Sequence, residues 1–117
     1  MQLLTGARII IVGGPRCGKS WLARELRRNG VPTYCGDPAS KVKEPEHESH
    51  YLPEGLPISG DDGAAQWVCD NWFTMPGPWC CEGWVMARAL RRWLGWPREQ
   101  RGIPADRIIV FTQHHPN

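Results

Sequence analysis

The chain has 117 residues, of which 41% are hydrophobic and 22% charged. This composition excludes a wholly disordered chain, and the length predicts a single domain over residues 1–117 with its own core. The formal net charge of +2 is too small to indicate nucleic acid as a partner. The longest aliphatic run, 9–12, is too short for a membrane span, and Arg8 interrupts the apolar stretch that a signal peptide needs.

The cysteines and histidines do not form a familiar pattern. Five cysteines include no C-x-x-C pair, and an odd number fits a disulfide framework poorly. Reduced thiols and a cytoplasmic location are therefore the simpler expectation. His47 and His50 lie three residues apart, but without cysteines at ligand spacing they do not predict a zinc site.

Apolar and amphipathic stretches alternate along the chain. The alternation is typical of a parallel sheet, so we predict an α/β fold of three layers, with about four strands and helices on both faces. Residues 39–60 show neither the helix nor the strand period and predict a long polar loop, and 112–117 a C-terminal tail. We expect strands over 8–12, 31–36, 79–81 and 107–111, and helices over 20–28, 63–73 (capped by 59–62) and 84–94.

The spacing of apolar residues also predicts which side of each helix faces the core. Most of the seven tryptophans are accordingly predicted to be core residues, with stacking of Trp67 or Trp72 on a substrate base as the alternative. The expected core sides are Trp21, Leu22 and Leu26 in the first helix, Ala64, Trp67, Val68 and either Asn71 or Trp72 in the second, and Ala87, Leu90 and Leu94 in the third.

A glycine-rich sequence, GGPRCGKS over 13–20, joins the first predicted strand to the first predicted helix. It matches G-x-x-x-x-G-K-[ST] at every fixed position. Glycines let backbone N–H groups turn inward around phosphate oxygens, and the helix N-terminus adds the positive end of its dipole. Lys19 would reach the β- and γ-phosphates, and the Ser20 hydroxyl would bind Mg²⁺. We therefore predict ATP and Mg²⁺ as cofactors, bound by Gly13, Gly14, Pro15, Arg16, Cys17, Gly18, Lys19 and Ser20.

On this motif and its context, the chain resembles the P-loop NTPases, and within them the small nucleotide kinases of phage and bacterial type. The resemblance covers residues 8–20 closely and the strand–helix alternation to Phe111 loosely. It implies an enzyme that transfers the γ-phosphoryl group of ATP to a small acceptor. The acceptor expected from the resemblance is a nucleoside monophosphate or a nucleoside.

Two acidic residues follow predicted strands, Asp37 after the second and Glu82 at the end of the third. Ligands of parallel sheets bind at the carboxyl ends of the strands, so both acids would share a rim with the glycine-rich loop. An acid there can hold Mg²⁺ or accept a proton from the attacking hydroxyl. Lys19, Asp37 and Glu82 are thus the predicted catalytic residues, and Ser20 and Glu82 the predicted metal ligands. The structural alternatives are a turn at Asp37 and a strand-end cap at Glu82.

The Glu82-Gly83 pair is similar to a strand-end Asp-Gly in nucleoside monophosphate kinases. The Phe-Pro-Arg that follows it there is absent, and Arg88 is the candidate substitute for the substrate-binding arginine. A solvated helix face is the alternative role for Arg88.

The resemblance also implies parts that this sequence lacks. Related kinases place a fifth strand and an arginine-bearing lid after the fourth strand, whereas only residues 112–117 follow Phe111 here. The second hypothesis is therefore a nucleotide-binding module or NTPase fragment without catalysis of its own, completed by a partner or by oligomerisation. A motor-type ATPase fits less well, because the third strand lacks the usual apolar run before an Asp-Glu pair.

Overall fold

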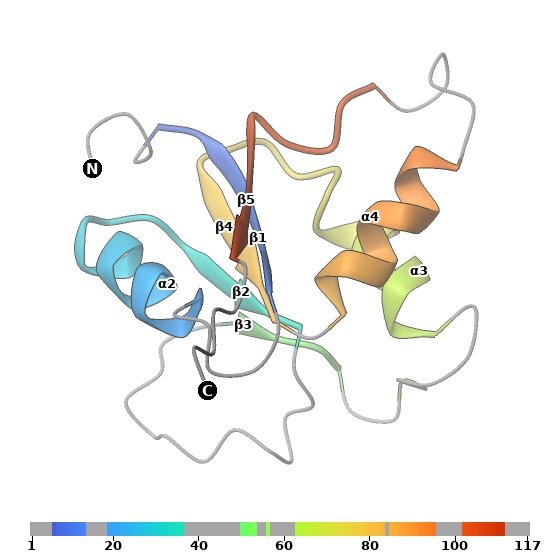
Figure 1. Cartoon of the computed structure of the whole chain (residues 1–117), viewed down its shortest axis with the longest axis horizontal. Coiled ribbons are helices and arrows are strands. Elements are labelled where there is room, and N and C mark those ends of the chain that lie inside the picture. The colour runs from blue at the N-terminus through green and yellow to red at the C-terminus, as the bar shows by residue number, and fades with distance from the viewer. Residues whose placement is uncertain are drawn as a thin grey trace, which may run out of the picture.

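Five parallel strands form one sheet in the order β3-β2-β4-β1-β5 (Figure 1). In this computed structural model, residues 6–13, 19–36, 50–53, 56, 63–83, 85–95 and 102–111 are described, and for 19 and 20 the backbone alone. The strands are β1 (Arg8–Gly13), β2 (Thr33–Cys35), β3 (His50–Tyr51), β4 (Trp79–Glu82) and β5 (Arg107–Phe111). The helices are α2 (Lys19–Arg28), α3 (Ala64–Asn71) and α4 (Met86–Leu94).

The helices cover both faces of the sheet, with α2 on one side and α3 and α4 on the other (Figure 1). Side chains of β1 alternate between the two layers, as the strand period requires. Ile9 and Ile11 pack beneath α2, whereas Ile10 packs beneath α3 and α4. All three are fully buried, and each contributes roughly 1.5–3 kcal/mol through burial. The predicted α/β fold with a parallel sheet between two helical layers is confirmed.

The predicted number of strands was wrong, because β3 lies within the expected loop over 39–60. Its two residues pair with β2 in parallel, His50 beside Tyr34 and Tyr51 beside Cys35. Two residues are too few to show a period of two in the sequence. The strand therefore exists through its pairing with β2 and not through a local pattern.

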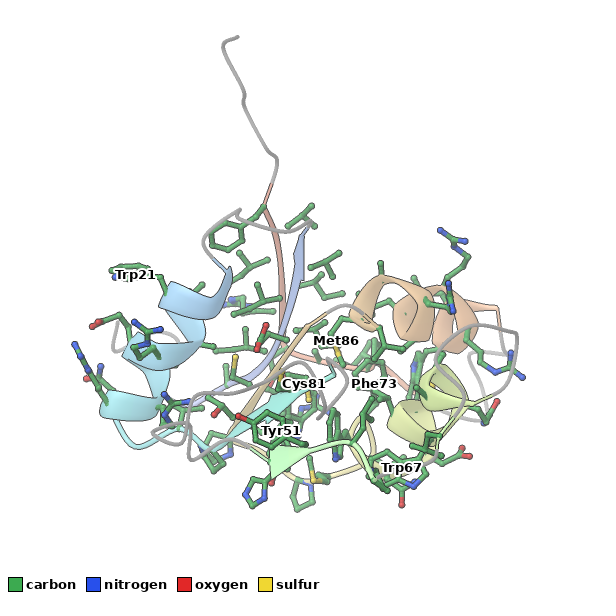
Figure 2. The ribbon with its side chains drawn as sticks, turned by 90° about the horizontal axis from the view of Figure 1, so that it is seen from below. Trp21, Tyr51, Trp67, Phe73, Cys81 and Met86 are labelled. Carbon is green, nitrogen blue, oxygen red and sulfur yellow. The ribbon has the colours of Figure 1, made fainter. Side chains whose placement is uncertain are left out.

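The core side predicted for the first helix is confirmed for Leu22 and Leu26 and was wrong for Trp21. Ala23 and Leu26 are buried and Leu22 is partly buried, whereas Trp21 is 60% exposed. Figure 2 shows Trp21 pointing away from the sheet on the outer side of α2. Since successive helical residues are about 100° apart, a core side centred between Leu22 and Ala23 turns Trp21 outward.

The core side predicted for α4 is confirmed for Leu90 and was wrong for Ala87 and Leu94. Met86, Ala89, Leu90 and Trp93 are buried, at the regular spacing of i, i+3, i+4 and i+7. Ala87 is exposed and Leu94 is 58% exposed, so two of the three expected residues face solvent. The larger side chains of Met86 and Trp93 take the core side, because they remove more apolar surface from water.

In α3 the core side is built from Ala64, Ala65, Val68 and Cys69. Trp72, just beyond the helix, is buried, whereas Asn71 is exposed, which settles the alternative left open by the spacing. The thiol of Cys69 donates a hydrogen bond of 3.2 Å to the carbonyl oxygen of Ala89, joining α3 to α4. The predicted cap over 59–62 lies outside the described residues.

Three tryptophans lie in the core between the sheet and the layer of α3 and α4, namely Trp72, Trp79 and Trp93. Two of them satisfy their indole N–H groups with backbone carbonyls, Trp79 with Met75 at 2.9 Å and Trp93 with Gly102 at 3.1 Å. The core role predicted for the tryptophans is confirmed for these three. Trp84 and Trp96 lie outside the described residues.

Among the described helices, none has the length and apolar character needed to cross a bilayer.

Candidate functional site

The carboxyl ends of β1, β2 and β4 lie along one edge of the sheet, because these strands are parallel and adjacent. β1 ends at Gly13 and α2 begins at Lys19. The strand before the glycine-rich loop and the helix after it are therefore as predicted. Residues 14–18, which include Arg16 and Cys17, lie outside the described residues, as do the side chains of Lys19 and Ser20.

The topology makes this edge a switch point. From β1 the chain enters α2 on one face, and from the adjacent β4 it enters α4 on the opposite face (Figure 1). Loops that leave neighbouring parallel strands toward opposite faces open a crevice between the strand ends, where ligands of α/β sheets bind. The sequence alone did not reveal that β1 and β4 are neighbours, since about 65 residues separate them along the chain.

Glu82 is the last residue of β4, and it is 5% exposed. Cys80, two residues earlier, packs in the cluster beneath α2, so the strand period directs Glu82 to the same face. In register, Glu82 lies opposite Cys35 of β2. Burying a carboxylate is costly in free energy, so a buried glutamate at a strand end facing α2 is unusual for a simple surface cap. The side chain of Glu82 thus lies on the face of the sheet that α2 covers.

Two glycines, Gly36 and Gly83, determine the course of the backbone around Glu82. The carbonyl oxygen of Glu82 accepts a hydrogen bond of 2.7 Å from the N–H of Gly36. The next residue, Gly83, has φ of +119°, a conformation that residues with a side chain rarely adopt. Nothing in the sequence singled out Gly36, because its importance depends on the contact between β2 and β4.

The charge of Glu82 affects the neighbouring thiols. Burial, and then the charge of Glu82, raise the pKa of the Cys80 thiol to about 12. Burial, followed by Cys80 and Glu82, raises the pKa of Cys81 well above its usual value. Both thiols therefore stay protonated near neutral pH. Because the thiolate is the nucleophilic form, this pair of cysteines is not suited to covalent catalysis.

Two further predicted site residues are Asp37 and Arg88. Asp37 lies outside the described residues, although Gly36 before it is on the same rim as Glu82. Arg88 is exposed in the first turn of α4. Arg88 therefore lies near the carboxyl edge of the sheet, as expected, but in the layer opposite α2. The structure places Glu82 on the face of the sheet that α2 covers and does not place Arg88 in that layer.

An aromatic row lies at the β2–β3 side of the sheet. The ring of Tyr34 stacks on His50 at a centroid distance of 4.7 Å and contacts Trp72 at 5.4 Å. Trp67 contacts Trp72 edge-on, also at 5.4 Å. Trp72 is only 4% exposed, so it belongs to the core and is not available to a ligand. Trp67 is half-buried, so base stacking is a hypothesis for Trp67 alone.

Within the described part of the chain, no three His, Cys, Asp or Glu side chains gather into a metal-binding group. The chemistry of Ser20 and Glu82 nevertheless suits Mg²⁺, which prefers a few oxygen ligands together with phosphate oxygens. Comparison of the chain with protein-family models, curated proteins and solved structures gave no match.

Proposed function

We propose that this chain is an ATP-binding kinase that transfers the γ-phosphoryl group of ATP to a small acceptor, a nucleoside monophosphate or a nucleoside. One observation carries the proposal. The sequence GGPRCGKS connects β1 to α2, and the buried carboxylate of Glu82 ends the adjacent parallel strand on the face that α2 covers. A phosphate-binding sequence and an acid are thus available on one side of one switch point.

Phosphoryl transfer depends on positioning and on stabilising charge in the transition state. In the proposal, the backbone N–H groups of residues 13–20 hold the phosphates and the Lys19 ammonium group neutralises charge on the γ-phosphoryl oxygens. The positive end of the α2 dipole acts in the same direction, and Arg27 and Arg28 complement its negative end in the last turn. The ends of β1 and α2 would thus form the donor side of the site.

Glu82 and Ser20 provide the oxygen ligands for Mg²⁺ in this proposal. When bound with ATP, Mg²⁺ supplies further charge neutralisation on the phosphates. Asp37, which follows Gly36 on the rim, is proposed as the acid that faces the acceptor hydroxyl and accepts its proton. Arg88, in the first turn of α4, is proposed to bind the acceptor's phosphate from the opposite layer.

The experiment is transfer of label from radiolabelled ATP to a panel of nucleoside monophosphates and nucleosides. We expect transfer with the wild-type chain and a loss of about 10²-fold or more in Lys19→Ala, because a group that stabilises transition-state charge is removed. Lys43→Ala is the matched control, since it removes the same charge outside the motif. Transfer that survives Lys19→Ala, or the absence of both ATP binding and transfer in a folded chain, would rule the proposal out.

A second candidate is a nucleotide-binding module that does not catalyse transfer alone. The exposure of Arg88 in the layer opposite α2 favours it, because the sheet then lies between the acceptor-side arginine and the helix that follows the glycine-rich sequence. Its signature is ATP binding that is lost in Lys19→Ala, with no transfer to any acceptor. Isothermal titration calorimetry on the same two proteins separates the two candidates.

A further inference from the structure

The carboxyl ends of β2 and β4 are joined through Gly36. Its N–H donates a hydrogen bond of 2.7 Å to the carbonyl oxygen of Glu82, one residue beyond the register pair of Cys35 and Glu82. On its other side, β4 pairs with β1 only as far as Cys81. The backbone of Glu82 is therefore held laterally from β2, through Gly36.

Gly36 has no space for a side chain. A Cβ atom added there would lie 2.6 Å from Cγ1 of Val85 and 2.8 Å from Cε of Met86, closer than carbon atoms approach one another. The Met86 methyl group ends a flexible chain and can move, whereas Val85 is buried and β-branched and cannot turn away easily. The φ of Gly36 lies outside the left-handed region, so the requirement for glycine is one of space and not of backbone conformation.

The close approach has a consequence for the candidate site. Val85 immediately precedes α4, and Gly83, with its φ of +119°, immediately follows Glu82. Any displacement of Val85 would thus be transmitted over three residues to Glu82. Figure 2 shows Met86 close to Cys81 between the sheet and α4, where the two belong to one buried cluster with Val85. Close packing of this kind transmits small displacements and does not absorb them.

We infer that Gly36 is a positioning residue: it lets β2 approach the turn after β4 and holds the backbone of Glu82, so that the carboxylate stays in register on the α2 face. The inference rests on the proposed function, in which Glu82 acts in phosphoryl transfer. It adds a residue that does not touch ATP or the acceptor.

The test is Gly36→Ala alone and combined with Val85→Ala. In Gly36→Ala, the displaced turn lowers kcat by about 10- to 100-fold, because a shift of about 1 Å in a catalytic group has effects of this size. Binding of ATP measured without Mg²⁺ is unchanged, since residues 13–20 are not substituted. The double variant lacks Cγ1 of Val85, and its kcat returns toward the wild-type value. A kcat that is unchanged in folded Gly36→Ala, or that the second substitution does not restore, would overturn the inference.

Gly77→Ala is the matched control. A Cβ at Gly77 would lie 2.6 Å from Cγ of Arg8, an equally close contact at the amino end of β4. Gly77→Ala is expected to lower the midpoint of thermal unfolding and to leave kcat unchanged at temperatures where the chain is folded. Equal losses of kcat in Gly36→Ala and Gly77→Ala would show that the effect is general destabilisation, and the inference would fail.

A readout without activity separates this inference from the proposed function. In carboxyl-labelled protein, the ¹³C chemical shift of Glu82 changes in Gly36→Ala and returns in the double variant, while Gly77→Ala leaves it unchanged. If the wild-type chain shows no transfer but this shift responds and reverts, the kinase proposal fails and the link between Gly36 and Glu82 stands. If Gly36→Ala does not fold, the double variant decides: a wild-type Glu82 shift supports the inference and an altered one contradicts it.

Discussion

The carboxylate of Asp106 accepts three hydrogen bonds from Arg8, of 2.8 Å from the backbone N–H, 3.2 Å from Nε and 3.0 Å from Nη2. The N–H of Asp106 donates a fourth, of 2.9 Å, to the carbonyl oxygen of Arg8. These contacts join the amino ends of β1 and β5, at the end of the sheet opposite the candidate site. They therefore allow stability to be tested separately from function.

The pH dependence of stability follows from this pair. Hydrogen bonds from the Arg8 side chain are the main cause that lowers the pKa of Asp106 from 3.8 to about 2. Because the pKa of Asp106 is lower in the folded chain, the pair stabilises the fold at pH values above the unfolded pKa of 3.8. This stabilisation is lost as the pH falls through the folded pKa of about 2. We expect Asp106→Asn to lower the midpoint of thermal unfolding at pH 7, and the difference from wild type to shrink as the pH falls from about 4 to 2. A difference that is constant over this range would contradict the prediction.

Substitution of Phe73 tests the packing of the aromatic core. Its ring stacks on Trp79 at 6.3 Å and meets Trp93 edge-on at 5.8 Å, and the side chain is buried. Phe73→Ala leaves a cavity, and we expect it to lower the free energy of unfolding by about 3–5 kcal/mol. Trp21→Ala, which removes an exposed aromatic ring, is expected to change it by about 0.5 kcal/mol or less. Urea unfolding followed by circular dichroism measures both, and similar effects of the two substitutions would be inconsistent with the described core.

The four described cysteines, Cys35, Cys69, Cys80 and Cys81, are buried, and none of them forms a disulfide within the described part of the chain. In a Cys17→Ser background, we expect no rapid reaction with a thiol reagent at pH 8 and reaction of all four after unfolding, because burial keeps these thiols inaccessible and raises the pKa of Cys80 and Cys81. A raised thiol pKa also means that stability falls as the pH rises from about 9 toward 12, since the unfolded chain then loses protons first. Fast labelling of Cys80 in the folded protein would contradict this picture.

Cys17 offers a direct probe of the glycine-rich loop, because it lies between Gly14 and Lys19 in the predicted phosphate site. Alkylation of Cys17 is expected to abolish ATP binding, and ATP with Mg²⁺ is expected to slow the alkylation. Cys17→Ser should bind ATP and resist the inhibition. Calorimetry and mass spectrometry of the labelled peptide give the two measurements, and alkylation at the same rate with and without ATP would count against a nucleotide at this loop.

The candidate site was predictable to a limited depth. The motif over 13–20 and the acid at the end of a strand are local patterns, so their positions could be recognised without the structure. The burial of Glu82 and its position on the α2 face depend on the register of β4 with β1 and β2. Gly36 was not recognised at all, because nothing near it in sequence indicates that Val85 will lie against it.

Hydrophobic periodicity in the sequence determined the α/β alternation, the parallel sheet and four of its five strands, because short apolar runs bounded by turn residues and separated by amphipathic stretches are local signals. Tertiary structure alone decided the rest. It created β3 through pairing with β2, turned Trp21 to solvent, and chose Met86 and Trp93 over Ala87 and Leu94 for the core. For β3 the physical reason is that a strand of two residues is defined only by its pairing partner. For the helices, the spacing of residues allows several sides to face inward, and the choice among them depends on the surface that the sheet presents.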